Sequence, residues 1–196
     1  MLLPFSARAR KWEPHAQALR KRLNLSPFEL LDPYKLASEV GLRIVDVHSL
    51  CKQLGNEVSK QILVRGRDAW SGGVFALPLP DGTRICVLNP THGPRRSKMT
   101  LMEEIAHVHL GHVPTVLIRS ADGLRMRDYN KTQEDEAFGV GAAALTPWEA
   151  FFRAINAGRT IDQLAETYDL SRQLVTYRVK ITGAYKLYCA RQRGGG

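Results

Sequence analysis

The chain has 196 residues, of which 44% are hydrophobic, and carries a formal net charge of +9. This composition excludes an intrinsically disordered chain and allows one sizeable core. No apolar run approaches the roughly 20 residues of a membrane helix and the first residues lack a secretory pattern, so we expect a cytoplasmic protein with no membrane partner.

The positive charge is concentrated at the two ends of the chain. Residues 1–22 have a net charge of +5 and residues 158–196 a net charge of +4, whereas residues 23–157 are neutral overall. Basic ends can contact DNA or an acidic protein, or can simply be solvated. Charge alone therefore leaves a nucleic-acid partner open.

A basic helix and a short helix–strand unit are the first predicted elements. In residues 9–25, apolar residues recur at helical spacing and Arg and Lys cover the opposite face. Asp32 can cap a second helix with Pro33 at its first position, and Gly41 should end that helix. LRIVDV, residues 42–47, then predicts a strand.

A β-hairpin is predicted from GVFAL and TRICVLN, residues 73–77 and 83–89, on either side of PLPDG. The Asp-Gly pair favours a tight turn between two strands. Cys86, inside the second strand, is expected to be a buried small hydrophobe. The three cysteines are far apart and form no CxxC pair, so neither a disulfide framework nor a cysteine zinc site is expected.

TLMEEIAHVHLGH, residues 100–112, predicts a helix with the outline of a zinc-protease site. Zinc proteases place two ligands at i and i+4 of one helix, and a general-base Glu follows the first ligand. Here Glu103 and His107 occupy the ligand positions, and Glu104 occupies the general-base position. A carboxylate can ligate Zn²⁺, and an additional anionic ligand also favours harder ions such as Mn²⁺.

The same segment has a purely structural interpretation. Thr100 can cap the helix while Glu103 reaches back to it, as in a capping box. Glu-x-x-x-His also occurs by chance in many chains. His109 lies on another helix face, and His112 lies near the helix end, where an imidazolium is favoured electrostatically.

A third ligand is expected from the second helix, EDEAFGVGAAAL, which should end near Pro147. Its small residues let it approach its neighbours closely, so we expect it to be buried. Glu134, at its start, shares a face with apolar residues and can turn inward, where a carboxylate needs a partner that a metal would supply. Glu136 is the alternative ligand.

The last segment predicts two short helices joined by the turn YDLS, with Thr160 and Ser171 as their caps. Leu174, Val175 and Val179 should face inward. This pattern is typical of a helix-turn-helix. In a DNA-binding version, the basic residues of the second helix would contact phosphates: Arg172, Arg178 and Lys180. A helix pair that only packs on the main domain is the open alternative.

The order of these elements, over roughly residues 30–182, resembles the ImmA/IrrE family of metallo-endopeptidases. The helix of that family typically reads R-x-R-F-T-L-A-H-E-x-x-H and is followed by E-x-E-A-N-x-F-A and a Leu-Met-Pro-like end. The matching residues are Thr100, Leu101, Glu104, His107, Glu134, Glu136, Ala137 and Pro147. Glu103 stands where the family has its first His, and Phe138 stands where it usually has Asn.

The resemblance implies that His107 is a metal ligand, Glu104 the general acid/base and Glu134 the third ligand. It also implies a helix-turn-helix repressor as the protein partner, in a stress response or a mobile element. The alternative is a catalytically degenerate relative that regulates transcription by binding DNA or protein.

We therefore expect an α+β fold: a zincin-like domain with a small twisted sheet and an active-site helix, then a helix-turn-helix-like module. The expected divisions are a basic N-terminal helix, a zincin-like metallopeptidase domain, the helical module and a disordered tail. They cover residues 1–25, 26–157, 158–190 and 191–196.

Overall fold

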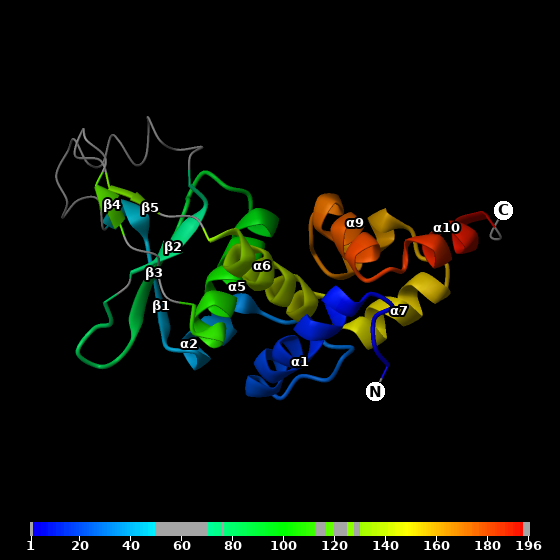
Figure 1. Ribbon diagram of the computed structural model, residues 1–196, viewed down its shortest axis with the longest axis horizontal. Coiled ribbons are helices and arrows are strands. Elements are labelled where there is room, and N and C mark those ends of the chain that lie inside the picture. The colour runs from blue at the N-terminus through cyan, green and yellow to red at the C-terminus, as the bar shows by residue number, and fades with distance from the viewer. Residues whose placement is uncertain are drawn as a thin grey trace.

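The computed structural model describes residues 2–49, 70–75, 77–112, 117–119, 125–127 and 130–193. Two long central helices, α5 and α6, have a small β-sheet at one end of the molecule and a group of C-terminal helices at the other (Figure 1). The α+β fold class is thereby confirmed. No helix in the described part of the chain is both long and apolar enough to cross a membrane.

The sheet contains the predicted hairpin and the predicted first strand. Its strands, in the order β1-β3-β2, are Leu42–Val45, Arg84–Leu88 and Gly72–Val74. β1 runs parallel to β3, and β2 runs antiparallel to it. Cys86 of β3 is fully buried, as expected. Cys51 and Ala76 lie outside the described residues. A separate antiparallel pair is formed by β4 (Leu117–Arg119) and β5 (Arg125–Arg127).

Helix α1 (Ala7–Arg22) packs through the apolar face that its sequence spacing predicts. Trp12, Ala16 and Leu19 of this helix are buried. Helix α2 (Pro33–Glu39) begins as predicted, because the carboxylate of Asp32 accepts a hydrogen bond from the backbone N–H of Tyr34 at 2.9 Å.

Helix α5 spans Pro94–Leu110, so it begins a turn and a half before the predicted start. Its N-cap is Gly93, and Thr100 lies buried in the helix interior. The capping-box interpretation of Thr100 and Glu103 was therefore wrong. The backbone N–H groups near Thr100 are already bonded within the helix, so they need no side-chain cap. The carboxylate of Glu103 therefore does not cap the start of the helix.

Helix α6 (Lys131–Leu145) lies very close to α5 because small residues form its contact face. A Cβ added to Gly141 would lie 3.1 Å from the backbone carbonyl of Met102 on α5. A Cβ added to Gly139 would lie 2.5 Å from the indole of Trp12 on α1. The two glycines thus let α6 fit tightly between α1 and α5, as the small-residue composition predicts.

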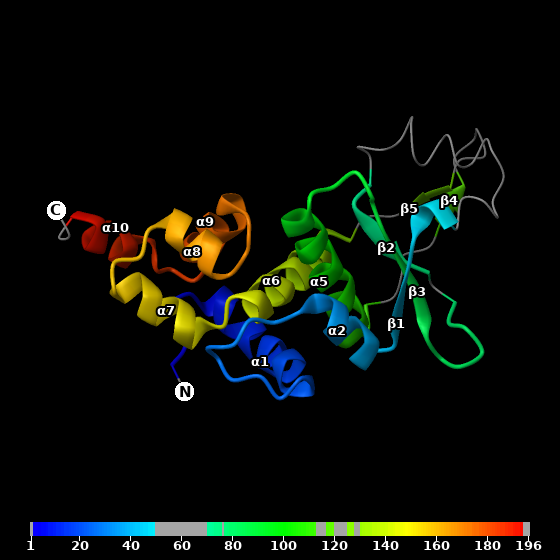
Figure 2. The same ribbon diagram turned by 180° about the vertical axis from the view of Figure 1, so that it is seen from behind.

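The C-terminal helices are α7 (Trp148–Asn156), α8 (Ile161–Thr167), α9 (Arg172–Ile181) and α10 (Tyr185–Arg193), with α8 visible from behind in Figure 2. The caps are the predicted ones: Thr160 forms a capping box with Gln163, and Ser171 accepts from the N–H of Leu174. The tail predicted from residue 191 was wrong for residues 191–193, which complete α10. Residues 194–196 lie outside the described part.

Helix α9 is attached to the central helices through a buried charge. The side chain of Arg178 has no exposed surface; its Nη2 lies 3.0 Å from Oε1 of Glu13 on α1, and its Nε donates to Oγ1 of Thr146 at 2.8 Å. The prediction that Arg178 contacts DNA was therefore wrong, because its guanidinium faces the core. Periodicity places a residue on a helix face but does not show that a neighbouring helix covers that face.

Arg20 is likewise unavailable to a nucleic-acid partner. Its guanidinium is buried and donates to three backbone carbonyls, those of Ser26, Glu29 and Ala144. Burial lowers the pKa of Arg20 from its usual value. The basic character of the two chain ends therefore overstates the positive charge that their surfaces present.

Candidate metal centre

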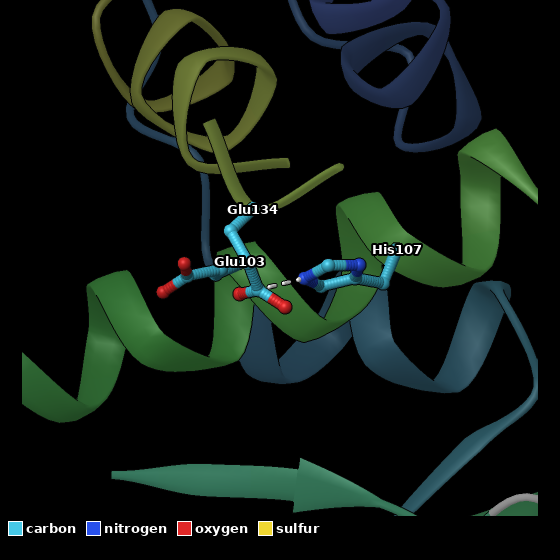
Figure 3. A group of neighbouring side chains, drawn as sticks. All are labelled: Glu103, His107 and Glu134. Carbon is cyan, nitrogen blue, oxygen red and sulfur yellow. Dashed lines mark ion pairs between the residues drawn. The ribbon is translucent and has the colours of Figure 1, made fainter. Parts of the chain in front are cut away.

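Glu103, His107 and Glu134 converge at the contact between α5 and α6. Glu103 and His107 lie one turn apart on α5, and Glu134 reaches toward them from the first turn of α6 (Figure 3). Each residue offers one ligand atom, and the three atoms lie within 4.8 Å of one another. Within the described residues, this is the group of His and carboxylate side chains with the spacing of a metal site.

His107 of α5 and Glu134 of α6 connect the two helices at the cluster. Nε2 of His107 lies 3.4 Å from Oε2 of Glu134, and the two side chains are 14% and 26% exposed. Asn130 caps α6 by accepting hydrogen bonds from the N–H groups of Thr132 and Gln133, which fixes the turn that carries Glu134. The two side chains are therefore largely, but not completely, shielded from water.

Three carboxylates crowd this part of α5 and α6. The pKa of Glu103 is raised to about 7, first because the side chain is buried and then because Glu134 and Glu104 place negative charge nearby. Desolvation and like charges both disfavour the ionised form. A divalent cation would relieve both effects.

The donor set fits a divalent cation. Two carboxylates and one imidazole can supply the three protein ligands of a catalytic zinc site, which leaves a position for water. The same set, being rich in oxygen, also suits Mn²⁺. The three donor atoms already lie within 4.8 Å of one another, and each belongs to a side chain with rotatable bonds that can adjust its position around one ion.

Glu104 lies on the neighbouring face of α5 and is 7% exposed. Its ligand atoms do not belong to the cluster, but its charge raises the pKa of Glu103. Burial raises the pKa of the Cys86 thiol on β3 to about 12, and the charge of Glu104 adds to this effect. The carboxylate of Glu104 thus lies near enough to both Glu103 and Cys86 to influence their pKa values, but it is not one of the clustered ligand groups.

The neighbours of Glu134 on α6 have other partners. Oδ2 of Asp135 lies 2.8 Å from Nη2 of Arg8. Oε2 of Glu136, the alternative ligand, lies 3.3 Å from Nε2 of His112 and outside the cluster. Phe138 packs edge-to-face on Tyr177 of α9, with ring centroids 5.0 Å apart.

Sequence reasoning missed the contact between His107 and His112, whose Nδ1 atoms lie 3.0 Å apart. The two residues are five positions apart, so helical periodicity does not pair them. The available signal was Gly111, a residue type that commonly ends a helix in the left-handed conformation and reverses the chain.

The candidate DNA-binding residues do not form one surface. Arg172 and Lys180 are exposed on α9, whereas Arg178 is buried. Arg172 forms an ion pair with Asp162 of α8. The helix pair therefore offers fewer free cations than the sequence suggests.

A protein-family model matches a large part of the chain. The family model of the peptidase M78 family, described as the IrrE N-terminal-like domain, matches residues 52–180, about two-thirds of the chain. Neither the curated proteins nor the solved structures include a match. The matched segment contains the hairpin, both helices of the candidate metal centre and the α8–α9 pair. The chain therefore belongs to the metal-dependent peptidase M78 family of IrrE-like proteins, which confirms the ImmA/IrrE resemblance.

Proposed function

We propose that this protein is a metal-dependent peptidase whose substrate is a helix-turn-helix transcriptional repressor, in a stress response or a mobile element. The observation that carries the catalytic part is the convergence of Glu103, His107 and Glu134, with Glu104 beside them. The repressor as partner rests on the family resemblance alone.

The residues of the site divide into ligands and a proton carrier. Glu103, His107 and Glu134 would hold Zn²⁺, with Mn²⁺ as the competing ion, and the bound cation supplies the Lewis acidity for peptide hydrolysis. Glu104 would accept a proton from the attacking water and deliver it to the leaving amide nitrogen. Two carboxylate ligands neutralise the charge of a divalent ion, so we expect weaker activation of water than in a His-rich site.

Metal content tests the site directly. Protein purified without a chelator or a His-tag should contain about one equivalent of zinc or manganese by mass spectrometry, as expected for one such site. A variant with both His107→Ala and Glu134→Ala should lose the metal. A metal-free native protein would contradict the proposal.

Peptide hydrolysis tests the role of Glu104. Incubation with a proteome-derived peptide library should give new termini with the metal-loaded protein. Glu104→Gln should lower the rate by about 10²–10⁴-fold while metal content stays the same, because the ligands are intact. Equal cleavage by Glu104→Gln would contradict the assigned role.

The second candidate function is that of a binding regulator without catalysis. The exposed Arg172 and Lys180 on α9 favour it. If these residues contact phosphates, replacing either with Ala should weaken DNA binding and reduce the salt slope by about 1. DNA affinity that responds to neither substitution would exclude this use of α9.

A further inference from the structure

His107 presents its two ring nitrogens to different partners. Nε2 faces Glu134 inside the cluster, whereas Nδ1 lies 3.0 Å from Nδ1 of His112. His112 places its own Nε2 3.3 Å from Oε2 of Glu136. We propose that His112 and Glu136 are positioning residues that hold His107 in the orientation and tautomer of a metal ligand. This inference rests on the proposed metal site.

The end of α5 builds this contact. Gly111 adopts φ +68°, and the chain reverses so that the N–H of His112 bonds to the carbonyl of His107 at 3.0 Å. Glycine adopts this left-handed conformation without strain. The His112 ring consequently lies over the last turn of the helix, with its centroid 5.0 Å from that of His107. Only 9% of the His112 side chain is exposed, so its ring is held in place.

The hydrogen positions follow from the chemistry of the contacts. Two imidazole nitrogens form a hydrogen bond when one carries hydrogen and the other does not. A metal ligand needs its lone pair at Nε2, so neutral His107 carries its hydrogen on Nδ1 and donates it to His112. A neutral His112 then carries its hydrogen on Nε2, where the acceptor is the carboxylate of Glu136. This pair of neutral tautomers satisfies both contacts of His112 and leaves the lone pair of His107 Nε2 facing Glu134, an arrangement of two acceptors that a bound cation would satisfy.

The opposite pair of neutral tautomers is incompatible with a metal bound at Nε2 of His107. It would place the lone pair at Nε2 of His112 against the carboxylate of Glu136, where both groups are acceptors. It would also put a hydrogen on Nε2 of His107, which could then donate to Glu134 but could not bind a metal. The carboxylate of Glu136 therefore favours, through His112, the tautomer of His107 that can bind a metal, whereas Glu134 favours the other tautomer in the metal-free protein. Residues in such a role typically contribute 10–100-fold to metal affinity.

Three substitutions separate hydrogen bonding from packing. His112→Phe keeps a ring but removes the acceptor, so Zn²⁺ binding should weaken by about 10–100-fold. His112→Asn supplies an oxygen acceptor in place of Nδ1 and should retain most of the affinity. His109→Phe is the matched control, because His109 lies on the same helix but packs against His15. That control should bind Zn²⁺ as tightly as the native protein.

Affinity is measured with Zn²⁺ alone, by competition with a chromogenic chelator, on full-length protein whose folding is checked by circular dichroism. Nuclear magnetic resonance of the zinc-loaded native protein, labelled with ¹⁵N at histidine, gives a second readout that needs no variant. It should show hydrogen on Nδ1 of His107 and on Nε2 of His112.

The possible outcomes separate this inference from the proposed function. Native-like affinity in His112→Phe, or hydrogen on Nδ1 of His112, would overturn the positioning role while leaving the metal site intact. A native protein that binds no Zn²⁺ would overturn both. Weak binding in His112→Phe, native-like binding in His112→Asn and His109→Phe, and the stated tautomers would together support the inference.

Discussion

The buried guanidinium of Arg178 on α9 lies 3.0 Å from the carboxylate of Glu13 on α1, and both side chains are almost completely shielded from water. This pair joins the C-terminal helices to the first helix of the chain. Breaking such a pair leaves one charge in a medium that cannot solvate it. The contact therefore makes the α8–α9 pair an integral part of the core.

Arg178→Ala should destabilise the protein by about 3–5 kcal/mol, because Glu13 would remain buried without its partner. Chemical denaturation at neutral pH measures this loss. Lys180→Ala is the matched control on the same helix, and its exposed position predicts a change within about 0.5 kcal/mol. Similar effects of the two substitutions would mean that α9 contributes little to the core.

Gly141→Ala should destabilise the protein by about 1–3 kcal/mol, because its Cβ would press on the backbone of Met102. Since Glu134 is on the same helix, displacement of α6 should also weaken metal binding. Thermal unfolding and chelator competition measure the two effects. Gly73→Ala is the control, because a Cβ at this position meets no atom within 4 Å. It should change neither the thermal stability nor the metal affinity strongly.

The stability of the metal-free protein should depend on Glu103. Its pKa is raised from 4.5 to about 7 in the folded state, chiefly by burial, so the folded protein binds this proton more tightly than the unfolded chain. The associated stabilisation is complete below pH 4.5 and is lost as the pH rises to about 7. The shift in pKa corresponds to at most about 3.5 kcal/mol of stability.

Glu103→Gln, which resembles the protonated side chain, tests this dependence. In the metal-free state it should be more stable than the native protein above pH 7 and equally stable below pH 4.5. Denaturant midpoints across this pH range, measured with chelator present, give the comparison. Parallel pH profiles for the two proteins would show that Glu103 ionises normally.

Glu103→His should shift metal preference toward Zn²⁺ over Mn²⁺, because an imidazole is a softer ligand than a carboxylate. The site would also lose one negative charge and gain Lewis acidity. Competition titrations with each ion measure the preference. Weaker binding of both ions would mean that the position accepts a carboxylate but not an imidazole.

The local structure of the chain was largely predictable from its sequence. Asp32, Thr160 and Ser171 cap helices as expected, and the Asp-Gly turn joins the strands of the hairpin. These features depend on hydrogen bonds and backbone preferences within a few residues. The start of α5 was missed because Thr100 offers a cap that the longer helix does not use.

The candidate ligands were also predictable as residue types at a spacing. Two side chains at i and i+4 of one helix share a face, and Glu134 opens the next buried helix. The ligand atoms of Glu103, His107 and Glu134 lie within 4.8 Å of one another because α5 and α6 pack closely. Gly141 makes this close packing possible. The candidate ligands could be identified from the sequence, whereas the distances between their ligand atoms depend on the packing of the two helices.

Burial and long-range pairing were decided by the tertiary structure alone. The sequence placed Arg178 on a basic helix face, but only the position of α1 shows that Glu13 covers it. Likewise, His112 meets His107 because the chain reverses at Gly111, and Glu136 arrives from a different helix. Sequence patterns record local periodicity and backbone preference, whereas these contacts depend on where distant segments pack against one another.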